Sequence, residues 1–292
     1  MILSVGEILV DMIGVENSFT MYVGGAPFNV AVNAKRAGAP VSFLGKVGDD
    51  VAGRFLLDKI PQFNLDNPII LVDKKRNTTL AFVSHNKDGD RDFTFFRRDT
   101  ADFQLSMKEL DFDKVAPLKI LNVGTLMLSE KKGRKFAKSL VEEGKKIGAK
   151  IAIDGNFRDD LYQNREERNS VLREFLLQAD ILKLSLDELL DFQNASSFEE
   201  AIDTIPFEKI IFITDGAKGS WVVVNKEYVF TSSHPVKAVD TTGAGDAYFG
   251  TALAYIHKLI EEEKPLTLEN LQEVAKFANE AGSKAVLKKG AL

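Results

Sequence analysis

The sequence Thr241-Thr242-Gly243-Ala244-Gly245-Asp246 combines an anion-binding turn with a carboxylate. The residues that follow, Ala247-Leu253, predict a buried helix that starts at this turn. Glycines at a helix entry allow close backbone approach to a ligand, and the N–H groups of the first turn lack intrahelical partners. The helix dipole favours negative charge there. Asp246 in the first turn could simply cap the helix, or it could act as a base beside a bound phosphoryl group.

Bulk composition excludes several classes of protein. The chain has 292 residues, 45% of them hydrophobic and 28% charged, which is typical of a globular domain. The net charge of −5 without a basic block argues against a nucleic-acid partner. No apolar run reaches the ~18 residues that a membrane span requires, and the N-terminus lacks a basic leader. The absence of cysteine fits a cytoplasmic location. His85, His234 and His257 form no metal-binding pattern.

Alternating apolar runs and helical patterns predict a single α/β domain built on a parallel sheet. The expected strands are Ile2-Val5, Val41-Lys46, Ile120-Val123, Ile151-Asp154, Ile181-Leu184 and Ile210-Thr214. The expected helices are Asn29-Ala37, Lys131-Ile147, Arg165-Ala179 and Leu268-Ala285. Gly148 is expected to end the second of these helices.

One region interrupts the alternation with strand-like segments that have no helix between them. These segments are Ile69-Val72, Thr78-Ser84 and Asp92-Arg97, with a turn-rich connector at Asn86-Arg91. Leu9-Tyr22 has a similar extended character. We therefore expect a small second sheet from insertions at about residues 12–23 and 68–99.

Polar residues and glycines follow several of the expected strands. They are Asp11, Gly24-Gly25, Asp154-Gly155-Asn156-Phe157-Arg158, Lys183 and Thr214-Asp215-Gly216. Ligands of open α/β sheets collect at the carboxyl ends of the strands, so these residues are expected to share one cleft.

Two of these motifs together resemble a known family. Gly24-Gly25-Ala26-Pro27-Phe28-Asn29 lies near the N-terminus and Gly243-Ala244-Gly245-Asp246 near the C-terminus. The chain thus resembles the PfkB, or ribokinase-like, carbohydrate kinases. The resemblance implies ATP-dependent phosphorylation of a sugar hydroxyl, with Asp246 as the base and the Gly243, Ala244 and Gly245 amides around the transferring group. It also implies that the second sheet is a β lid over the sugar, which would exclude water.

The resemblance further suggests the sugar contacts, namely Asp11, Gly24, Gly25, Asn29, Phe96, Arg97 and Arg158. An amide and a carboxylate suit a polyol, which offers both donors and acceptors. The Arg91-Asp102 segment and Asp154-x-Asn156-x-Arg158 are similar to those of fructokinases and of 2-keto-3-deoxygluconate kinases. Both subfamilies usually have proline where Gly155 stands. D-fructose is the favoured acceptor, although a keto-acid carboxylate could pair with Arg97, Arg98 or Arg158.

For the nucleotide, the resemblance implies contacts from Lys183, Thr214, Gly216, Gly219 and Asn279. Glu188 would bind Mg²⁺ through water, although Ser185 replaces the usual asparagine of this segment. Asp240 and Thr242 are candidate ligands of K⁺. Family members occur as monomers or as dimers paired through their lids, and a homodimer is weakly favoured here.

Other classes of function fit the sequence less well. A nicotinamide-dependent oxidoreductase would show G-x-G-x-x-G after an early strand, and a P-loop NTPase would show G-x-x-x-x-G-K-[ST]; the sequence has neither. A non-catalytic sugar-binding regulator on the same fold stays open, but loss of the base would be expected in such a protein.

Overall fold

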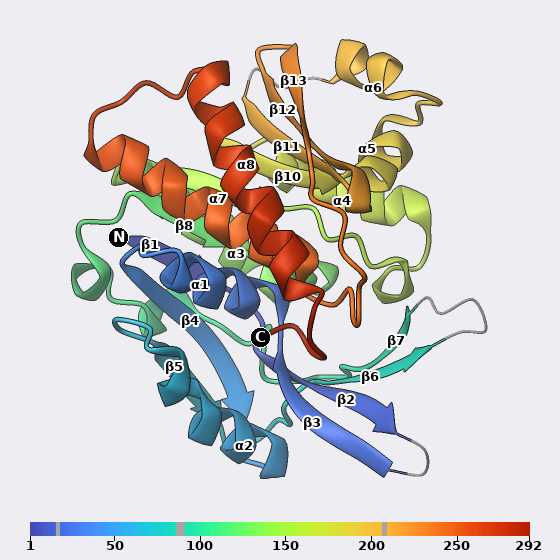
Figure 1. The fold of residues 1–292 in the computed structure, drawn as a ribbon. Helices are drawn as coiled ribbons and strands as arrows, with labels where there is room; N and C mark the ends of the chain where they lie inside the picture. Colours follow the sequence, from blue (N-terminus) through green and yellow to red (C-terminus); the bar gives the residue numbers. More distant parts are fainter. Residues whose placement is uncertain (16–17, 86–90, 206–208) are drawn as a thin grey trace.

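The computed structural model describes residues 1–15, 18–85, 91–205 and 209–292. Within them, a nine-stranded sheet has the order β13-β12-β11-β10-β9-β8-β1-β4-β5 (Figure 1). Its strands are β1 (Ile2–Val5), β4 (Val41–Gly48), β5 (Ile69–Asp73), β8 (Ile120–Val123), β9 (Lys150–Asp154), β10 (Ile181–Ser185), β11 (Ile210–Asp215), β12 (Gly219–Val224) and β13 (Glu227–Ser232). From β5 to β11 the neighbours run parallel, whereas β12 and β13 are antiparallel additions. The predicted α/β class is confirmed.

Helices cover both faces of this sheet. One face carries α1 (Ala26–Arg36), α2 (Val51–Lys59), α7 (Ala244–Glu261) and α8 (Leu268–Ala285). The other carries α3 (Lys131–Lys146), α4 (Arg165–Leu176), α5 (Leu186–Gln193) and α6 (Phe198–Thr204). In the described part of the chain, no helix is both long and apolar enough to cross a membrane.

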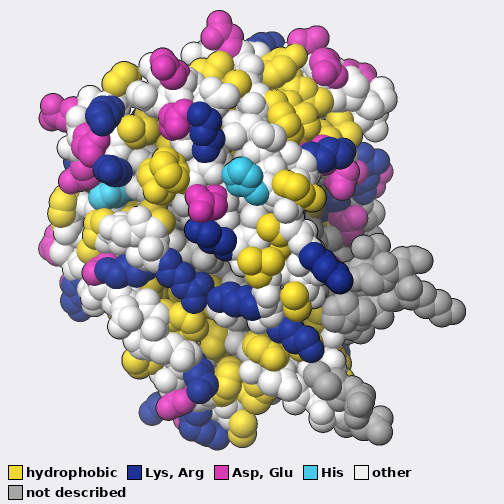
Figure 2. Space-filling model, viewed as in Figure 1, with side chains coloured by type: hydrophobic (Ala, Val, Ile, Leu, Met, Phe, Trp, Pro, Cys, Tyr) yellow, Lys and Arg dark blue, Asp and Glu magenta, His cyan; other side chains and the backbone are white. Residues whose placement is uncertain are grey.

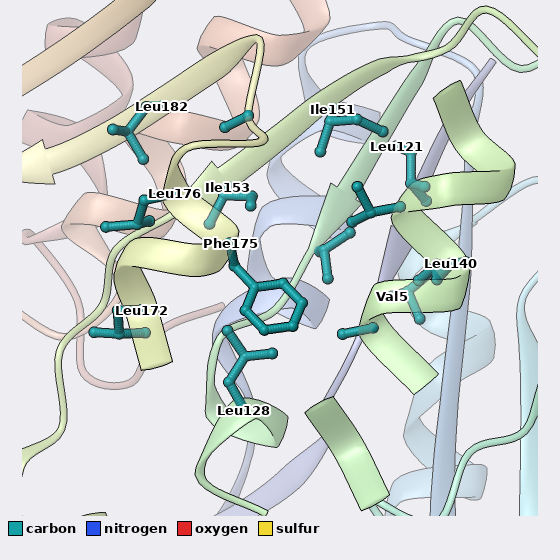
Figure 3. Packing of buried hydrophobic residues seen from close by; sticks show 14 of the residues in the cluster. Val5, Leu121, Leu128, Leu140, Ile151, Ile153, Leu172, Phe175, Leu176 and Leu182 are labelled. Atoms are coloured by element: carbon teal, nitrogen blue, oxygen red, sulfur yellow. The ribbon is translucent and has the colours of Figure 1, made fainter. Parts of the chain in front are cut away.

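The buried strands explain why two cores form. Successive side chains of a strand point to opposite faces, so Ile120 packs under α7 and α8 while Leu121 packs under α3. Figure 3 shows the second of these cores, in which Phe175 of α4 lies among Ile153, Leu128 and neighbouring aliphatic side chains. Such two-sided burial accounts for the continuous apolar runs of the strands.

A smaller, four-stranded sheet has the order β3-β2-β6-β7. Its strands are β2 (Leu9–Val15), β3 (Ser18–Gly24), β6 (Leu80–His85) and β7 (Arg91–Phe96). They come from the two insertions that the sequence indicated. The connector expected at residues 86–91 lies mostly outside the described residues.

The assignment of Ile69-Val72 to the small sheet was wrong. This segment forms β5, which pairs in parallel with β4 at the edge of the large sheet, with Leu44 opposite Ile69. Helix α2 was not predicted from the sequence. Asp50 caps its N-terminus by accepting a 2.7 Å hydrogen bond from the Gly53 N–H. A strand, a helix and a further strand make a crossover that returns the chain to the same sheet in parallel.

The expected helices are present, with small differences at their ends. Helix α1 begins at Ala26 rather than Asn29, because Pro27 is tolerated in a first turn and Gly25 adopts a φ of +108° before it. Helix α4 ends at Leu176, three residues before the expected Ala179. Gly148, with a φ of +80°, follows the end of α3 as predicted.

Candidate active site

A polar cavity of about 410 Å³ opens at the carboxyl ends of β1, β9 and β10, next to the small sheet. Many of the residues predicted from the sequence line it, and they come from distant parts of the chain. They are Asp11, Gly25, Asn29, Arg158, Lys183, Thr242, Gly243, Gly245 and Asp246. We call this cavity the first cavity. Of the strand-end residues expected to share one cleft, Asp11, Gly25, Asp154, Asn156, Arg158 and Lys183 line this cavity, whereas Thr214 and Gly216 line a second one.

A second cavity, of about 200 Å³, lies on the other side of the start of α7. It gathers the residues predicted to contact the nucleotide, together with aromatic and small side chains. The predicted residues in its wall are Thr214, Gly216, Gly219 and Asn279. Thr241 and Gly245 line both cavities, so the two spaces meet at the N-terminus of α7.

Backbone conformation and close packing explain the glycines at this junction. Gly243 has a φ of +75°, and a Cβ there would lie 2.8 Å from the Ala291 Cα. A Cβ on Gly245 would lie 2.9 Å from the Lys183 Nζ. The sequence analysis grouped Ala244 with these glycines, but its N–H donates to the Thr241 carbonyl at 3.4 Å and its side lines the second cavity. We call the turn formed by Gly243, Ala244 and Gly245, which the sequence predicts to hold the transferring group, the anion cradle.

Asp246 lies in the first turn of α7 and is held there by Asn29. The Asn29 Nδ2 donates to the Asp246 Oδ2 at 2.8 Å. Burial raises the pKa of Asp246, while the Asn29 hydrogen bond and the charges of Lys183 and Arg158 oppose this rise. The Asn29 Oδ1 is buried and has no hydrogen-bond partner among the described residues, so it can accept from a bound hydroxyl.

Lys183 lies in the first cavity beside Asp154. Its Nζ is 3.0 Å and 3.1 Å from the two Asp154 carboxylate oxygens, and both side chains are about nine-tenths buried. Burial alone would lower the pKa of Lys183, but Asp154, Glu188 and Asp246 raise it overall. The ammonium group therefore stays charged in the first cavity. Lys183, predicted as a nucleotide contact, thus lies apart from the other predicted nucleotide residues, which line the second cavity.

Gly24 packs closely against Asp11. A Cβ at Gly24 would lie 2.2 Å from the Asp11 Oδ2, so glycine is required here to make room for the Asp11 carboxylate. Asp11 in turn lines the first cavity. The predicted contact of Gly24 itself with the sugar stays a prediction.

Two residues of β7 do not take the positions predicted for them. Phe96 is 59% exposed and packs against Phe82 on the outer face of the small sheet, whereas Phe95 lines the first cavity. Arg97 is buried in an ion pair with Asp102, at 2.7 Å, and donates to the Ser129 hydroxyl. The alternation of a strand places Phe95 and Phe96 on opposite faces, and the prediction was wrong by one residue.

Glu188 and Ser185 form a capping box at the start of α5. The Glu188 Oε2 accepts from the Ser185 N–H at 2.8 Å, and the Ser185 Oγ accepts from the Glu188 N–H at 3.1 Å. The Glu188 Oε1 accepts from the Phe157 N–H at 2.7 Å. Glu188 therefore connects α5 to the loop that carries Arg158.

Asp240 and Thr242 lie together near the cradle, as predicted. The Asp240 Oδ1 accepts from the Thr242 N–H at 2.8 Å and from its hydroxyl at 2.7 Å. The Asp240 Oδ2 accepts from the Gly290 N–H at 2.9 Å. These bonds join the loop before α7 to the C-terminal segment.

Glu7 is a cavity residue that the sequence analysis missed. It is 2% exposed, lines the first cavity, and its Oε2 has no hydrogen-bond partner among the described residues. Burial raises the pKa of Glu7 to about 8, and Asp102 and Asp246 add to this rise. Glu7 follows β1 directly, so the strand-end rule that selected Asp11 could have selected Glu7 as well.

The titration of Glu7 predicts how stability depends on pH. An acid whose pKa rises from 4.5 to about 8 on folding takes up a proton between these values, so folding becomes less favourable as the pH rises through them. We expect Glu7→Gln to gain stability relative to the wild type between pH 5 and pH 8, on the order of 2 kcal/mol. Urea unfolding at both pH values measures this, with the exposed Glu227→Gln as a control. Parallel pH profiles for wild type and Glu7→Gln would contradict it.

Comparison with known proteins gives the family context of these two cavities. A sequence profile described as "pfkB family carbohydrate kinase" matches residues 1–292. Fructokinase-1 of Zea mays is 33% identical over 306 residues, covering 100% of this chain and 93% of that protein. The fructokinase of Vibrio alginolyticus is 31% identical over 291 residues, covering 98% and 93%.

Solved structures of similar proteins share the whole fold. A fructokinase double mutant from Vibrio cholerae O395, with fructose, ADP and potassium ion bound, superposes with a TM-score of 0.90 at 28% identity, covering 99% of this chain and 93% of that one. An uncharacterised sugar kinase from Pyrococcus horikoshii in complex with ATP gives a TM-score of 0.87 at 33% identity, covering 100% and 94%.

Proposed function

The chain belongs to the pfkB family of carbohydrate kinases, and from this we propose that it transfers the γ-phosphoryl group of ATP to a hydroxyl of D-fructose. The prediction of an ATP-dependent sugar kinase is confirmed by the family. The observation that supports the specific proposal most is the meeting of the two cavities at the start of α7, where Asp246 lies.

In this proposal the sugar occupies the first cavity and ATP the second. A sugar hydroxyl beside Asp246 attacks the γ-phosphorus, the bond from phosphorus to the bridging oxygen breaks, and ADP leaves. Asp246 accepts the hydroxyl proton, and a raised pKa makes its carboxylate a stronger base than a solvated aspartate. Positioning and charge stabilisation by the cradle and Lys183 are expected to contribute more than proton removal.

Replacing the proposed base tests this mechanism. Asp246→Asn keeps the shape and can still contact Asn29, so it should bind fructose and ATP with affinities near those of the wild type. Its turnover should fall by roughly 10²–10⁴-fold, the usual contribution of a positioned general base. Coupled measurement of ADP release, with calorimetric titration of both ligands, separates the two effects. Turnover close to wild type would remove Asp246 from the mechanism.

The positions of the arginines favour a neutral ketose over a keto acid. Arg97 forms a buried ion pair with Asp102, and Arg98 is exposed. Of the three guanidinium groups considered as carboxylate partners, Arg158 is the one that lines the first cavity. Asp11 and Asn29 line the same cavity and suit the hydroxyls of a neutral sugar.

Side-by-side kinetics with several acceptors tests the choice of substrate. We expect kcat/KM for D-fructose to exceed that for 2-keto-3-deoxygluconate by at least ~10-fold, roughly 1.4 kcal/mol of transition-state binding. Ribose serves as a further neutral acceptor. A preference of ~100-fold for the keto acid would reject fructose while leaving the kinase assignment intact.

We also propose that the protein binds two cations, Mg²⁺ and K⁺. Mg²⁺ keeps most of its waters and needs few protein ligands, so it would bind mainly the ATP phosphates, with Glu188 acting through water. K⁺ would lie beside the Asp240-Thr242 turn, close to the cradle. Replacing K⁺ by Li⁺ at constant ionic strength should lower kcat several-fold. Equal rates with the two ions would argue against the potassium site.

A homodimer paired through the small sheets is proposed as well. Phe19 and Phe96, 55% and 59% exposed, flank Phe82 on the outer face of that sheet at ring distances of 5.0 Å. An exposed aromatic cluster of this kind is typical of an interaction surface.

Light scattering should give a dimer mass for the wild type and a monomer mass for the Phe19→Ser, Phe96→Ser variant. Phe230→Ser, which removes another exposed ring, is the control and should stay dimeric. A monomeric wild type would overturn the proposal. We also propose a cytoplasmic location, which the absence of cysteine supports.

A further inference from the structure

A third hollow lies on the sheet face that carries α1, α7 and α8, and it shares no lining residue with the first or the second cavity. Helix α7 packs against both α1 and α8, so it forms the floor between them. The resulting groove has a volume of about 520 Å³ and is lined by α1, α7, α8 and the segment after α8. We call it the α1–α8 groove. Figure 2 shows Lys and Arg side chains in a band across this face, where α1 and α8 lie in Figure 1.

The cations of the α1–α8 groove outnumber its acids. Arg36, Lys284 and Lys288 line it, and the acid that lines it, Glu280, is paired with Lys284 at 2.6 Å. Neither Arg36 nor Lys288 has an ion pair or side-chain hydrogen bond with the described residues. Partial burial lowers the pKa of Lys288, and the charge of Arg36 lowers it further. Two cations therefore face one groove without a counter-ion, on a protein whose net charge is −5.

The floor of the groove offers polar groups that the fold itself does not use. Thr251 of α7 is 7% exposed, and its hydroxyl has no hydrogen-bond partner among the described residues. Asn33 of α1 is 9% exposed, and its Nδ2 donates to the Asn29 backbone carbonyl. The side-chain oxygen Oδ1 of Asn33 is left as an acceptor. Both residues line the groove, so these polar atoms can donate to or accept from a ligand in it.

One wall of the groove is aromatic. Tyr255 of α7 and Phe277 of α8 stack with ring centroids 4.3 Å apart and an angle of 8° between the rings. Phe277 is 43% exposed and so presents part of its ring to the groove. An aromatic surface beside a pair of cations suits a ligand that has an organic body and an anionic end.

We propose that the α1–α8 groove binds a small phosphate ester, with the phosphate between Arg36 and Lys288 and its organic part against Tyr255 and Phe277. A phosphate dianion would neutralise both cations and offer acceptor oxygens to arginine and lysine donors. The Thr251 hydroxyl would donate to the same phosphate from the floor of the groove. The groove thereby gains a function separate from the sugar and nucleotide cavities.

The groove is connected to the anion cradle by a short stretch of chain. Lys288 and Ala291 line the groove. Between them, the Gly290 N–H donates to Asp240, which also holds Thr242. Ala291 itself packs against Gly243 so closely that a Cβ there would lie 2.7 Å from the Ala291 Cβ. A ligand that orders Lys288 should therefore alter the cradle, and nucleotide binding should alter the groove to the same extent.

Binding measurements on the full chain test the site. Ribose 5-phosphate and inorganic phosphate are titrated calorimetrically with both cavities filled by fructose and a non-hydrolysable ATP analogue. We expect saturable binding, tighter for the ester than for inorganic phosphate. The Arg36→Gln, Lys288→Gln variant should bind the ester at least ~10-fold more weakly, about 1.4 kcal/mol. Lys289→Gln removes an exposed neighbouring charge outside the groove and should change the affinity less than ~2-fold.

Three results would overturn the site: no saturable binding to the wild type, an equal loss in Lys289→Gln, or equal affinity for inorganic phosphate and the ester. Thr251→Val, of similar volume, should weaken binding of the ester, whereas Thr251→Ser should not. Equal affinities for these two variants would contradict the role of the hydroxyl.

For the connection to the cradle, saturating ester should change the KM for ATP in the wild type but not in Arg36→Gln, Lys288→Gln. An unchanged KM in the wild type would contradict that connection. The comparison of Arg36→Gln, Lys288→Gln with Lys289→Gln identifies the groove whichever sugar is phosphorylated, because neither variant changes a residue that lines the first cavity.

Discussion

The close contact between α1 and α7 sets the geometry of the active site. Gly250 of α7 meets the backbone of α1, where an added Cβ would lie 2.5 Å from the Val30 carbonyl oxygen. At this separation the Asn29 amide reaches Asp246 across a sequence distance of 217 residues. Any larger residue at position 250 would push the helices apart and remove the group that orients the carboxylate. The two sequence motifs at opposite ends of the chain therefore work as one unit only because a glycine lies between their helices.

The net charge of the first cavity depends on burial as well as on counter-ions, because burial favours the neutral form of a carboxylic acid. Glu7, Asp11, Asp154 and Asp246 line it, opposed by Lys183 and Arg158. Removing carboxylates from water favours their protonated forms, and the pKa of both Glu7 and Asp246 is raised for this reason. Lys183 stays charged because three acids surround it. The cavity therefore holds a charged lysine beside an aspartate whose carboxylate is a stronger base than a solvated one.

Sequence patterns predicted the parts of this protein that rest on repeated local signals. The buried strands were recognised because they are continuous apolar runs, and the cavity residues because they follow those strands. The wrong predictions concern positions whose place in the structure depends on a single neighbouring residue or a single interaction partner. Phe95 and Phe96 are chemically identical in the sequence, and only the strand register decides which of them lines the first cavity. Arg97 could not be assigned without Asp102, and β5 was misplaced because α2 was overlooked. Glu7 follows β1 directly and could have been selected by the same strand-end rule, but its burial and its unpaired Oε2 are visible only in the structure.

The capping box of α5 also affects the loop that carries Arg158. The two subfamilies that this segment resembles usually have proline where Gly155 stands; here a Cβ would lie 2.4 Å from the Leu184 Cδ2, so a larger residue would require the Leu184 side chain to move. The Glu188 carboxylate holds the loop instead, through the Phe157 N–H. A ring restricts the backbone whether or not a ligand is present, whereas a hydrogen bond can be exchanged for another. The Arg158 loop is thus fastened by a reversible link, and a ligand that offers Glu188 or Phe157 a better partner could release it.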